Sequence, residues 1–199
     1  QPMTAAGLAV GAMALVAIGD NVTPAVAEHV GLWQFHYLRS AISLAILAAL
    51  ASVFGWALMP NNWRGVLGRG GLHAIAMVIY FGCAAFLPVT QVLAALFTAP
   101  LFLLILSLFE GKRPDAGRWG LTLLGFMGCV AVVQPDFSSF GMLSLASFLA
   151  AIFYGLGNKV TQTWGAHDTP WVMVGVYLAI LAVIGALGLL LSPGGDSFF

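Results

Sequence analysis

The sequence predicts an all-α polytopic membrane protein with seven transmembrane helices, and three observations support this fold class. Hydrophobic residues make up 61% of the 199 residues and charged residues only 7%, whereas a soluble domain carries about 25% charged residues. Seven apolar runs are long enough to cross a bilayer core, which takes about 20 residues of helix. The chain also matches itself without a gap when it is shifted by 138 positions (171 − 33), which indicates an internal repeat.

The predicted helices follow the apolar runs in order, and turn-forming residues separate them. Proline, glycine and asparagine mark the segments 60–62, 111–114 and 135–136, and only residues 87–89 separate the third run from the fourth. That short connection predicts a tight helical hairpin. The expected spans are residues 4–23, 32–58, 72–87, 89–109, 118–133, 142–162 and 170–191.

The repeat divides the predicted fold into two units. Residues 1–137 hold five spans as a first repeat, and residues 138–199 hold the first two spans of a second, incomplete repeat. Because five is an odd number, the second copy would enter the membrane upside down, which is the inverted-repeat build of secondary transporters. The matched pairs include Gly19 with Gly157, His29 with His167, Trp33 with Trp171 and Ile42 with Ile180.

Positive charge is distributed unevenly between the predicted loops. The loops after spans 32–58 and 89–109 hold five Lys or Arg residues, and the loops after spans 4–23, 72–87 and 118–133 hold none. Cytoplasmic loops of membrane proteins carry the excess of Lys and Arg. We therefore expect the basic loops and the N-terminus to face the cytoplasm. The five residues are Arg64, Arg69, Lys112, Arg113 and Arg118.

Several short stretches occur together in a characteristic order. They are Ala-Ala-Leu-Phe-Thr-Ala-Pro at 94–100, Leu-Phe-Glu at 108–110, Arg-Trp at 118–119, Gly-Phe-Met-Gly at 125–128, Tyr-Phe-Gly at 80–82 and the intramembrane Arg39. With the repeat and the charge bias, they resemble the EamA-type repeat of the drug/metabolite transporter superfamily. The resemblance covers residues 4–135 as one repeat and 142–192 as the opening of a second.

The resemblance implies ten spans in two inverted repeats, of which this sequence lacks the last three. It also implies a bacterial inner (plasma) membrane protein that moves small polar or amphipathic metabolites by alternating access.

Charged residues near or inside the apolar spans are the first candidates for substrate binding. A charge at the centre of a membrane helix costs about 2.5–3.5 kcal/mol, so Arg39 calls for an explanation. Arg39 would anchor a carboxylate or phosphate of the substrate, or it would extend to the lipid headgroups or pair with Asp20. Asp20 and Asn21 lie near the outer end of the first span and are substrate-binding candidates. Asp20 would pair with Arg39, accept a proton in coupling, or have a capping or interfacial role. Lys159, the repeat equivalent of Asn21 (21 + 138 = 159), would line the same cavity or extend to the headgroups.

Uncharged polar residues inside the spans are the second group of candidates. Tyr80, Gln91 and Tyr154 would each hydrogen-bond a ligand or tie two helices together. Pro100, in the middle of span 89–109, removes one backbone hydrogen bond and predicts a kink. That kink would act as a hinge or as a static packing feature.

Other classes of function find no support in the sequence. The sequence contains no G-x-S-x-G, H-E-x-x-H or P-loop motif, so an enzyme is not predicted. Cys83 and Cys129 lie in apolar runs, where small core residues are expected, and neither a metal site nor a cofactor is predicted. Seven basic and seven acidic residues give a net charge of zero, which excludes a broad nucleic-acid interface.

Two functions therefore remain open from the sequence. The first is a carrier in which Arg39 holds an anionic group of a small-molecule substrate. The second is a non-transporting accessory or assembly subunit, derived from such a carrier and embedded in a homodimer or a larger membrane complex. The second is motivated by the two-span second repeat. We expect that the sequence is part of a longer chain, since residues 192–196 resemble a loop between spans, and this favours the carrier.

Overall fold

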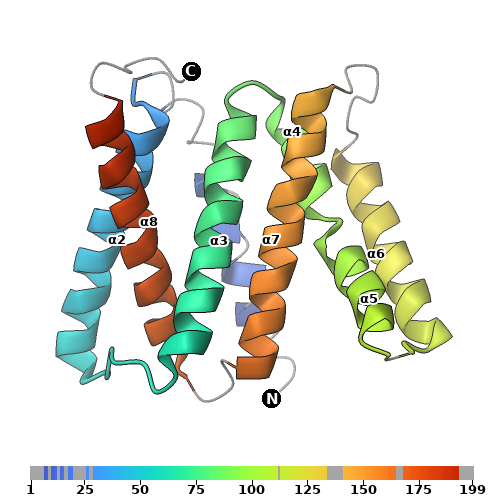
Figure 1. Ribbon diagram of the computed structural model, residues 1–199, viewed down its shortest axis with the longest axis horizontal. Helices are drawn as coiled ribbons and strands as arrows, with labels where there is room; N and C mark the ends of the chain where they lie inside the picture. Colours follow the sequence, from blue (N-terminus) through green and yellow to red (C-terminus); the bar gives the residue numbers. More distant parts are fainter. Residues whose placement is uncertain are drawn as a thin grey trace.

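The computed structural model of the chain is a bundle of roughly parallel and antiparallel helices (Figure 1). It describes residues 29–111, 113–133, 141–164 and 168–192, together with positions 7, 8, 10–12, 14, 15, 18, 19 and 26. Every regular element within these residues is a helix. In chain order they are α2 (Leu32–Phe54), α3 (Trp63–Ala84), α4 (Val89–Leu96), α5 (Ala99–Phe109), α6 (Ala116–Val133), α7 (Met142–Trp164) and α8 (Pro170–Leu191).

Helix α3 lies at the centre of the bundle. It packs against both α7 and α8, while α2 packs on α8 and both α4 and α5 pack on α7. Helix α6 lies beyond α5, at the edge of the bundle opposite α2 (Figure 1). Helices far apart in the sequence are therefore direct neighbours, and polar residues of α3 face partners more than 90 positions away along the chain.

Four described segments are long and apolar enough to cross a membrane: Leu32–Phe54, Trp63–Ala84, Val89–Phe109 and Pro170–Leu191. Large apolar side chains also point away from the bundle along α2, α6 and α8. A bilayer is the solvent in which such a surface is stable. The predicted fold class, an all-α polytopic membrane protein, is confirmed.

Glycines allow the helices to approach closely. A Cβ atom added at Gly185 of α8 would lie 2.7 Å from the backbone nitrogen of Tyr37, and one added at Gly188 would overlap the ring of Trp33. A Cβ atom at Gly157 of α7 would overlap the ring of His73. Small residues at such crossings let membrane helices pack with little space between their backbones.

Two helix ends differ from the predicted ones by four residues or more. Helix α2 ends at Phe54 rather than at residue 58, because Gly55 takes the left-handed conformation (φ 69°) and the Trp56 N–H bonds to the Ala51 carbonyl. Helix α3 begins at Trp63 rather than at residue 72, and the Asn62 side chain caps it by accepting the Gly65 N–H.

The early start of α3 moves two of the basic residues that define the predicted orientation. Arg64 and Arg69 were expected in a loop, and the prediction was wrong for both. They lie in the first two turns of α3. A helix can carry a charge such as that of Arg69 where neighbouring helices supply polar groups.

The predicted span 89–109 is divided into α4 and α5 by the turn at Phe97 and Thr98. Pro100 therefore lies in the first turn of α5 and not in the middle of a continuous helix. A proline is tolerated there because its missing N–H would have no partner inside the helix. The predicted interruption of the span is present, at a position just before the proline. Helix α8 has the predicted bounds, and most of the predicted span 4–23 lies outside the described residues.

Candidate functional site

Unpaired polar atoms concentrate on one stretch of α2. Within the described residues, five buried side-chain atoms have no hydrogen-bond partner. Four of them are Nδ1 and Nε2 of His36, Nη1 of Arg39 and Oγ of Ser40, and the fifth is Oε1 of Gln91. Both His36 and Ser40 have 0% exposed surface. Because a buried polar group without a partner costs about 1–3 kcal/mol, this stretch is expensive unless a ligand uses it.

Aromatic rings hold the Arg39 side chain. Its guanidinium carbon lies 5.4 Å from the centre of the Phe81 ring and 5.9 Å from that of Phe35. The His36 ring meets the same two rings edge-on, at 5.4 and 5.7 Å. A desolvated cation–π contact contributes about 2 kcal/mol and leaves the N–H donors of the guanidinium available. Arg39 is therefore positioned without an acidic partner in the described part of the chain.

A second polar group joins α3, α7 and α8. Arg69 Nε donates to Thr161 Oγ1 at 3.0 Å, and Arg69 Nη1 donates to the Met173 carbonyl at 3.2 Å. The His73 ring, one turn further along α3, bonds through Nδ1 to the Arg69 carbonyl at 3.0 Å. These bonds tie three helices together at the end of the bundle where α3 begins.

Two tyrosines lie beside His73 in this polar group. The ring centre of His73 lies 4.9 Å from that of Tyr154 and 6.4 Å from that of Tyr177. The polar group around Arg69 and His73 therefore includes a tyrosine from α7 and one from α8.

Two of the predicted uncharged candidates lie elsewhere in the bundle. Gln91, which is 3% exposed, donates through Nε2 to Ser144 Oγ at 3.0 Å and thereby ties α4 to α7. Tyr80 is part of the apolar core, where its ring packs edge-on against Phe81 at 5.1 Å. This bond is of the kind expected if Gln91 ties two helices together.

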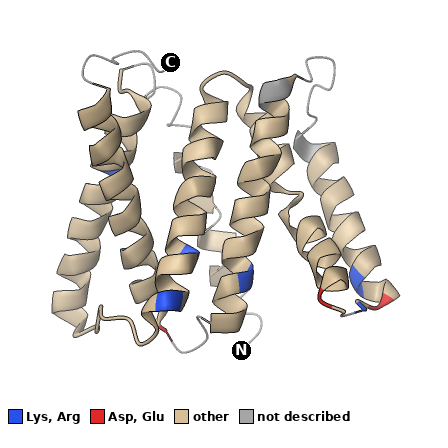
Figure 2. Ribbon diagram, viewed as in Figure 1, with Lys and Arg blue, Asp and Glu red and all other residues tan. Residues whose placement is uncertain are grey.

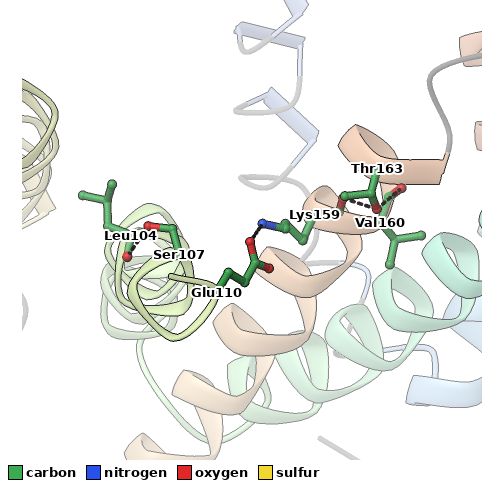
Figure 3. Close-up of polar contacts among 6 residues, drawn as sticks. All are labelled: Leu104, Ser107, Glu110, Lys159, Val160 and Thr163. Carbon is green, nitrogen blue, oxygen red and sulfur yellow. Dashed lines mark hydrogen bonds and ion pairs between the residues drawn. The ribbon is translucent and has the colours of Figure 1, made fainter. Parts of the chain in front are cut away.

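Lys159 forms an ion pair rather than an isolated charge. Its Nζ lies 2.5 Å from Glu110 Oε2, which joins α7 to the end of α5 (Figure 3). The two side chains are 20% and 33% exposed. Figure 2 shows that most Lys and Arg residues of the described chain gather at this end of the bundle, which is the lower end in the view. Lys159 thus has a partner that the sequence analysis did not assign to it.

Asp20 and Asn21, the remaining two candidates, lie outside the described residues. Of the candidates within them, Tyr154 lies beside His73 and Arg39 lies over two phenylalanine rings, while Gln91 and Lys159 are bonded to other partners.

Sequence reasoning missed several residues of the site, and two patterns could have found them. His36 with Ser40, and Arg69 with His73, are spaced four apart, which places both members of each pair on one helix face. Tyr177 occupies the position equivalent to Arg39 in the repeat, since 39 + 138 = 177. These relations between residues are not visible when each polar residue is considered alone. Within the described residues, no group of three His, Cys, Asp or Glu side chains could hold a metal ion.

Known proteins similar to this chain are bacterial transporters. The chain is 29% identical over 165 residues to a riboflavin transporter of Rhizobium johnstonii, which covers 81% of the chain and 52% of the relative. It is 33% identical over 130 residues to a riboflavin transporter of Vibrio cholerae, and this match covers 64% of the chain and 40% of the relative. It is 25% identical over 150 residues to a pseudopaline exporter of Pseudomonas aeruginosa, and this match covers 74% of the chain and 53% of the relative.

The chain is an integral membrane protein related to bacterial transporters. It spans about half the length of the curated relatives it matches. No family model matches the chain, and no solved structure matches it.

Proposed function

We propose that the protein is a carrier of small metabolites of the drug/metabolite type, that it works by alternating access, and that Arg39 binds an anionic group of the substrate. The relatives supply the class, because they are named as transporters of riboflavin and pseudopaline. The single observation that carries the role of Arg39 is its buried Nη1, which lies in a membrane span without a hydrogen-bond partner. Ionisable residues inside membrane spans generally mark a substrate or ion path.

The proposed inverted repeat has support in the packing of α2 on α8. Tyr37 of α2 contacts Gly185 of α8. In the repeat, Tyr37 is equivalent to Gly175 (37 + 138) and Gly185 is equivalent to Leu47 (185 − 138). These two equivalent residues are also in contact, because a Cβ atom at Gly175 would lie 3.2 Å from Leu47 Cδ2. A two-fold relation between two inverted copies requires this kind of reciprocal contact. Substrate sites of such carriers lie between the two copies near the middle of the bilayer.

The proposed orientation puts the basic end of the bundle on the cytoplasmic side, and with it the N-terminus. The gathering of Lys and Arg at one end supports it, because cytoplasmic ends carry the excess of these residues (Figure 2). A single cysteine introduced at exposed Arg118 in a variant that lacks the two native cysteines would react with a membrane-impermeant maleimide only after the cells are opened. Reaction in intact cells would reverse the orientation.

The proposed function is tested by metabolite accumulation in cells that express the protein from its native gene. Mass spectrometry would follow a panel of metabolites that bear a carboxylate or a phosphate. Riboflavin, which bears neither group, would be followed beside them. We expect at least one compound to be accumulated or depleted relative to cells without the protein. Losing a charged hydrogen bond of 1.5–3 kcal/mol should reduce the rate roughly 10- to 100-fold in Arg39→Gln.

The matched control is Arg64→Gln, which removes an exposed arginine of α3 and should leave the rate unchanged. Equal levels of every compound with and without the protein would contradict the carrier function. An unchanged rate in Arg39→Gln for each transported compound would contradict the role of Arg39 alone. A homodimer or larger complex stays a prediction, which the mass of the purified protein in mild detergent would test.

A further inference from the structure

We infer that His36, Arg39 and Ser40 form a three-point site on α2 for the carboxylate or phosphate group of a soluble organic anion. This inference rests on the proposed function and extends it, because it assigns two further binding residues and restricts the substrates to those that carry an oxyanion. The observation behind it is the concentration of unpaired buried atoms on these three residues.

The three side chains offer complementary chemistry on one helix face. Residues 39 and 40 lie three and four positions after residue 36, so both side chains are neighbours of His36 on the surface of α2. The Arg39 guanidinium can only donate, the Ser40 hydroxyl donates one hydrogen, and a neutral His36 ring donates through one nitrogen. A carboxylate or phosphate presents several acceptor lone pairs and no competing donor when it is ionised. Such a group can therefore accept a hydrogen bond from each of the three residues.

Other helix hydroxyls in this protein show that Ser40 is not in an ordinary structural arrangement. Ser52 Oγ donates to the Ala49 carbonyl at 2.7 Å, and both Ser107 and Ser147 donate to carbonyls three residues back at 2.6 Å. This local bond is the usual solution for a serine inside a helix. Ser40 is fully buried and does not form it. Its hydroxyl is left available to a partner from outside the helix.

Charge also favours an anionic ligand. The three described acidic residues are all engaged away from α2: Glu110 bonds to Lys159, Asp115 to Arg118 and Asp168 to the Asn61 and Asn62 N–H groups. Within the described residues, the positive charge of Arg39 is balanced only by the faces of two phenylalanine rings. A ligand that brings its own negative charge completes the site.

The binding test uses the purified protein in detergent after removal of lipid, with the apparent unfolding temperature as readout. The probes are benzoate and inorganic phosphate, and the neutral isostere benzamide serves as the ligand control at equal concentration and ionic strength. We expect benzoate or phosphate to raise the unfolding temperature and benzamide to leave it unchanged. The rise should be lost in Arg39→Gln and reduced in Ser40→Ala and His36→Phe. It should persist in Ser52→Ala and Arg64→Gln, the matched controls.

A second readout separates a binding role from a structural one. If the three residues bind a ligand and do not stabilise the empty protein, Ser40→Ala and His36→Phe should not lower the unfolding temperature when no probe is present. Their unfolding temperatures should equal or exceed that of the parent protein. A structural role would lower the unfolding temperature in both variants without changing the probe-induced rise. The same rise with benzamide, an unchanged rise in Arg39→Gln, or no rise with either anion would overturn the inference.

Lipid is the competing source of an oxyanion. Stabilisation by phosphatidylglycerol but by neither soluble anion would assign the site to a lipid headgroup and overturn the inference as stated. Because this test measures binding and not transport, it can fail while metabolite accumulation succeeds, and the reverse also holds. The two proposals are therefore distinguishable.

Discussion

Two regions of the bundle differ in whether their buried polar groups have hydrogen-bond partners. At the end where α3 begins, polar groups are paired across helices, and we call this region the tethered end: Asn61, Asn62, Arg69, Thr161 and Asp168. There the Asp168 carboxylate accepts the N–H groups of Asn61 at 2.6 Å and Asn62 at 3.2 Å. On α2, the unpaired face formed by His36, Arg39 and Ser40 has no such bonds within the described residues. The contrast is sharpest between the two arginines, since Arg69 has two acceptors and Arg39 has two aromatic rings.

The difference separates stability from binding. Polar groups that satisfy one another hold helices together, and their loss destabilises the fold. Polar groups that are buried and unsatisfied lower the stability of the empty protein, and they persist when they serve a function. The tethered end therefore holds α3, α7 and α8 together, and the unpaired face is the place to look for a ligand.

The largest expected effect on stability is at Arg69. Arg69→Gln removes the guanidinium bonds to Thr161 and Met173, each worth about 1.5–3 kcal/mol for a charged donor, and the shorter side chain restores little of them. We expect the free energy of unfolding to fall by about 3 kcal/mol in detergent. Denaturant unfolding followed by circular dichroism measures this. Arg64→Gln should stay within about 0.5 kcal/mol of the parent, as exposed substitutions do.

A smaller loss is expected where α7 crosses α3. Gly157→Ala places a methyl group where the His73 ring lies, so the ring or the helix must move. Overpacking of this kind costs about 1–3 kcal/mol. Gly128→Ala is the matched control, because a Cβ atom there meets nothing within 4 Å. The control should be neutral or more stable by up to about 1 kcal/mol, and equal losses in both variants would show that α3 and α7 do not meet at this glycine.

The smallest effect is expected at the ion pair between α5 and α7. Lys159 and Glu110 are partly exposed, so their interaction should contribute about 0.5–1 kcal/mol to stability. A double-mutant cycle with Lys159→Met and Glu110→Gln isolates this coupling energy. If the pair also restrains α5 during transport, either variant should change the transport rate more than the stability. A coupling energy of zero would show that the pair does not stabilise the packing of α5 on α7.

Much of the fold could be predicted from local sequence, but only part of the site could. Helix α8 and the outer limits of the 89–109 segment follow from apolar length alone, and both were right. The start of α3 was wrong because Arg69 is stabilised by Thr161 and Met173, which lie 92 and 104 positions away in the chain. Distant partners of this kind leave no mark on the local pattern. Arg39 was identified from its cost in the bilayer, but the burial of His36 and Ser40 beside it depends on how α2 packs.

The most direct test of the account makes the same substitution at both arginines. Arg39→Gln and Arg69→Gln would be compared in one experiment for unfolding temperature and for accumulation of a transported metabolite. The account predicts that Arg39→Gln loses transport and lowers the unfolding temperature less than Arg69→Gln does, because Arg39 loses contacts with two aromatic rings whereas Arg69 loses two hydrogen bonds. If Arg39→Gln instead unfolds as early as Arg69→Gln, Arg39 is a structural residue and the assignment of the unpaired face to a ligand is wrong.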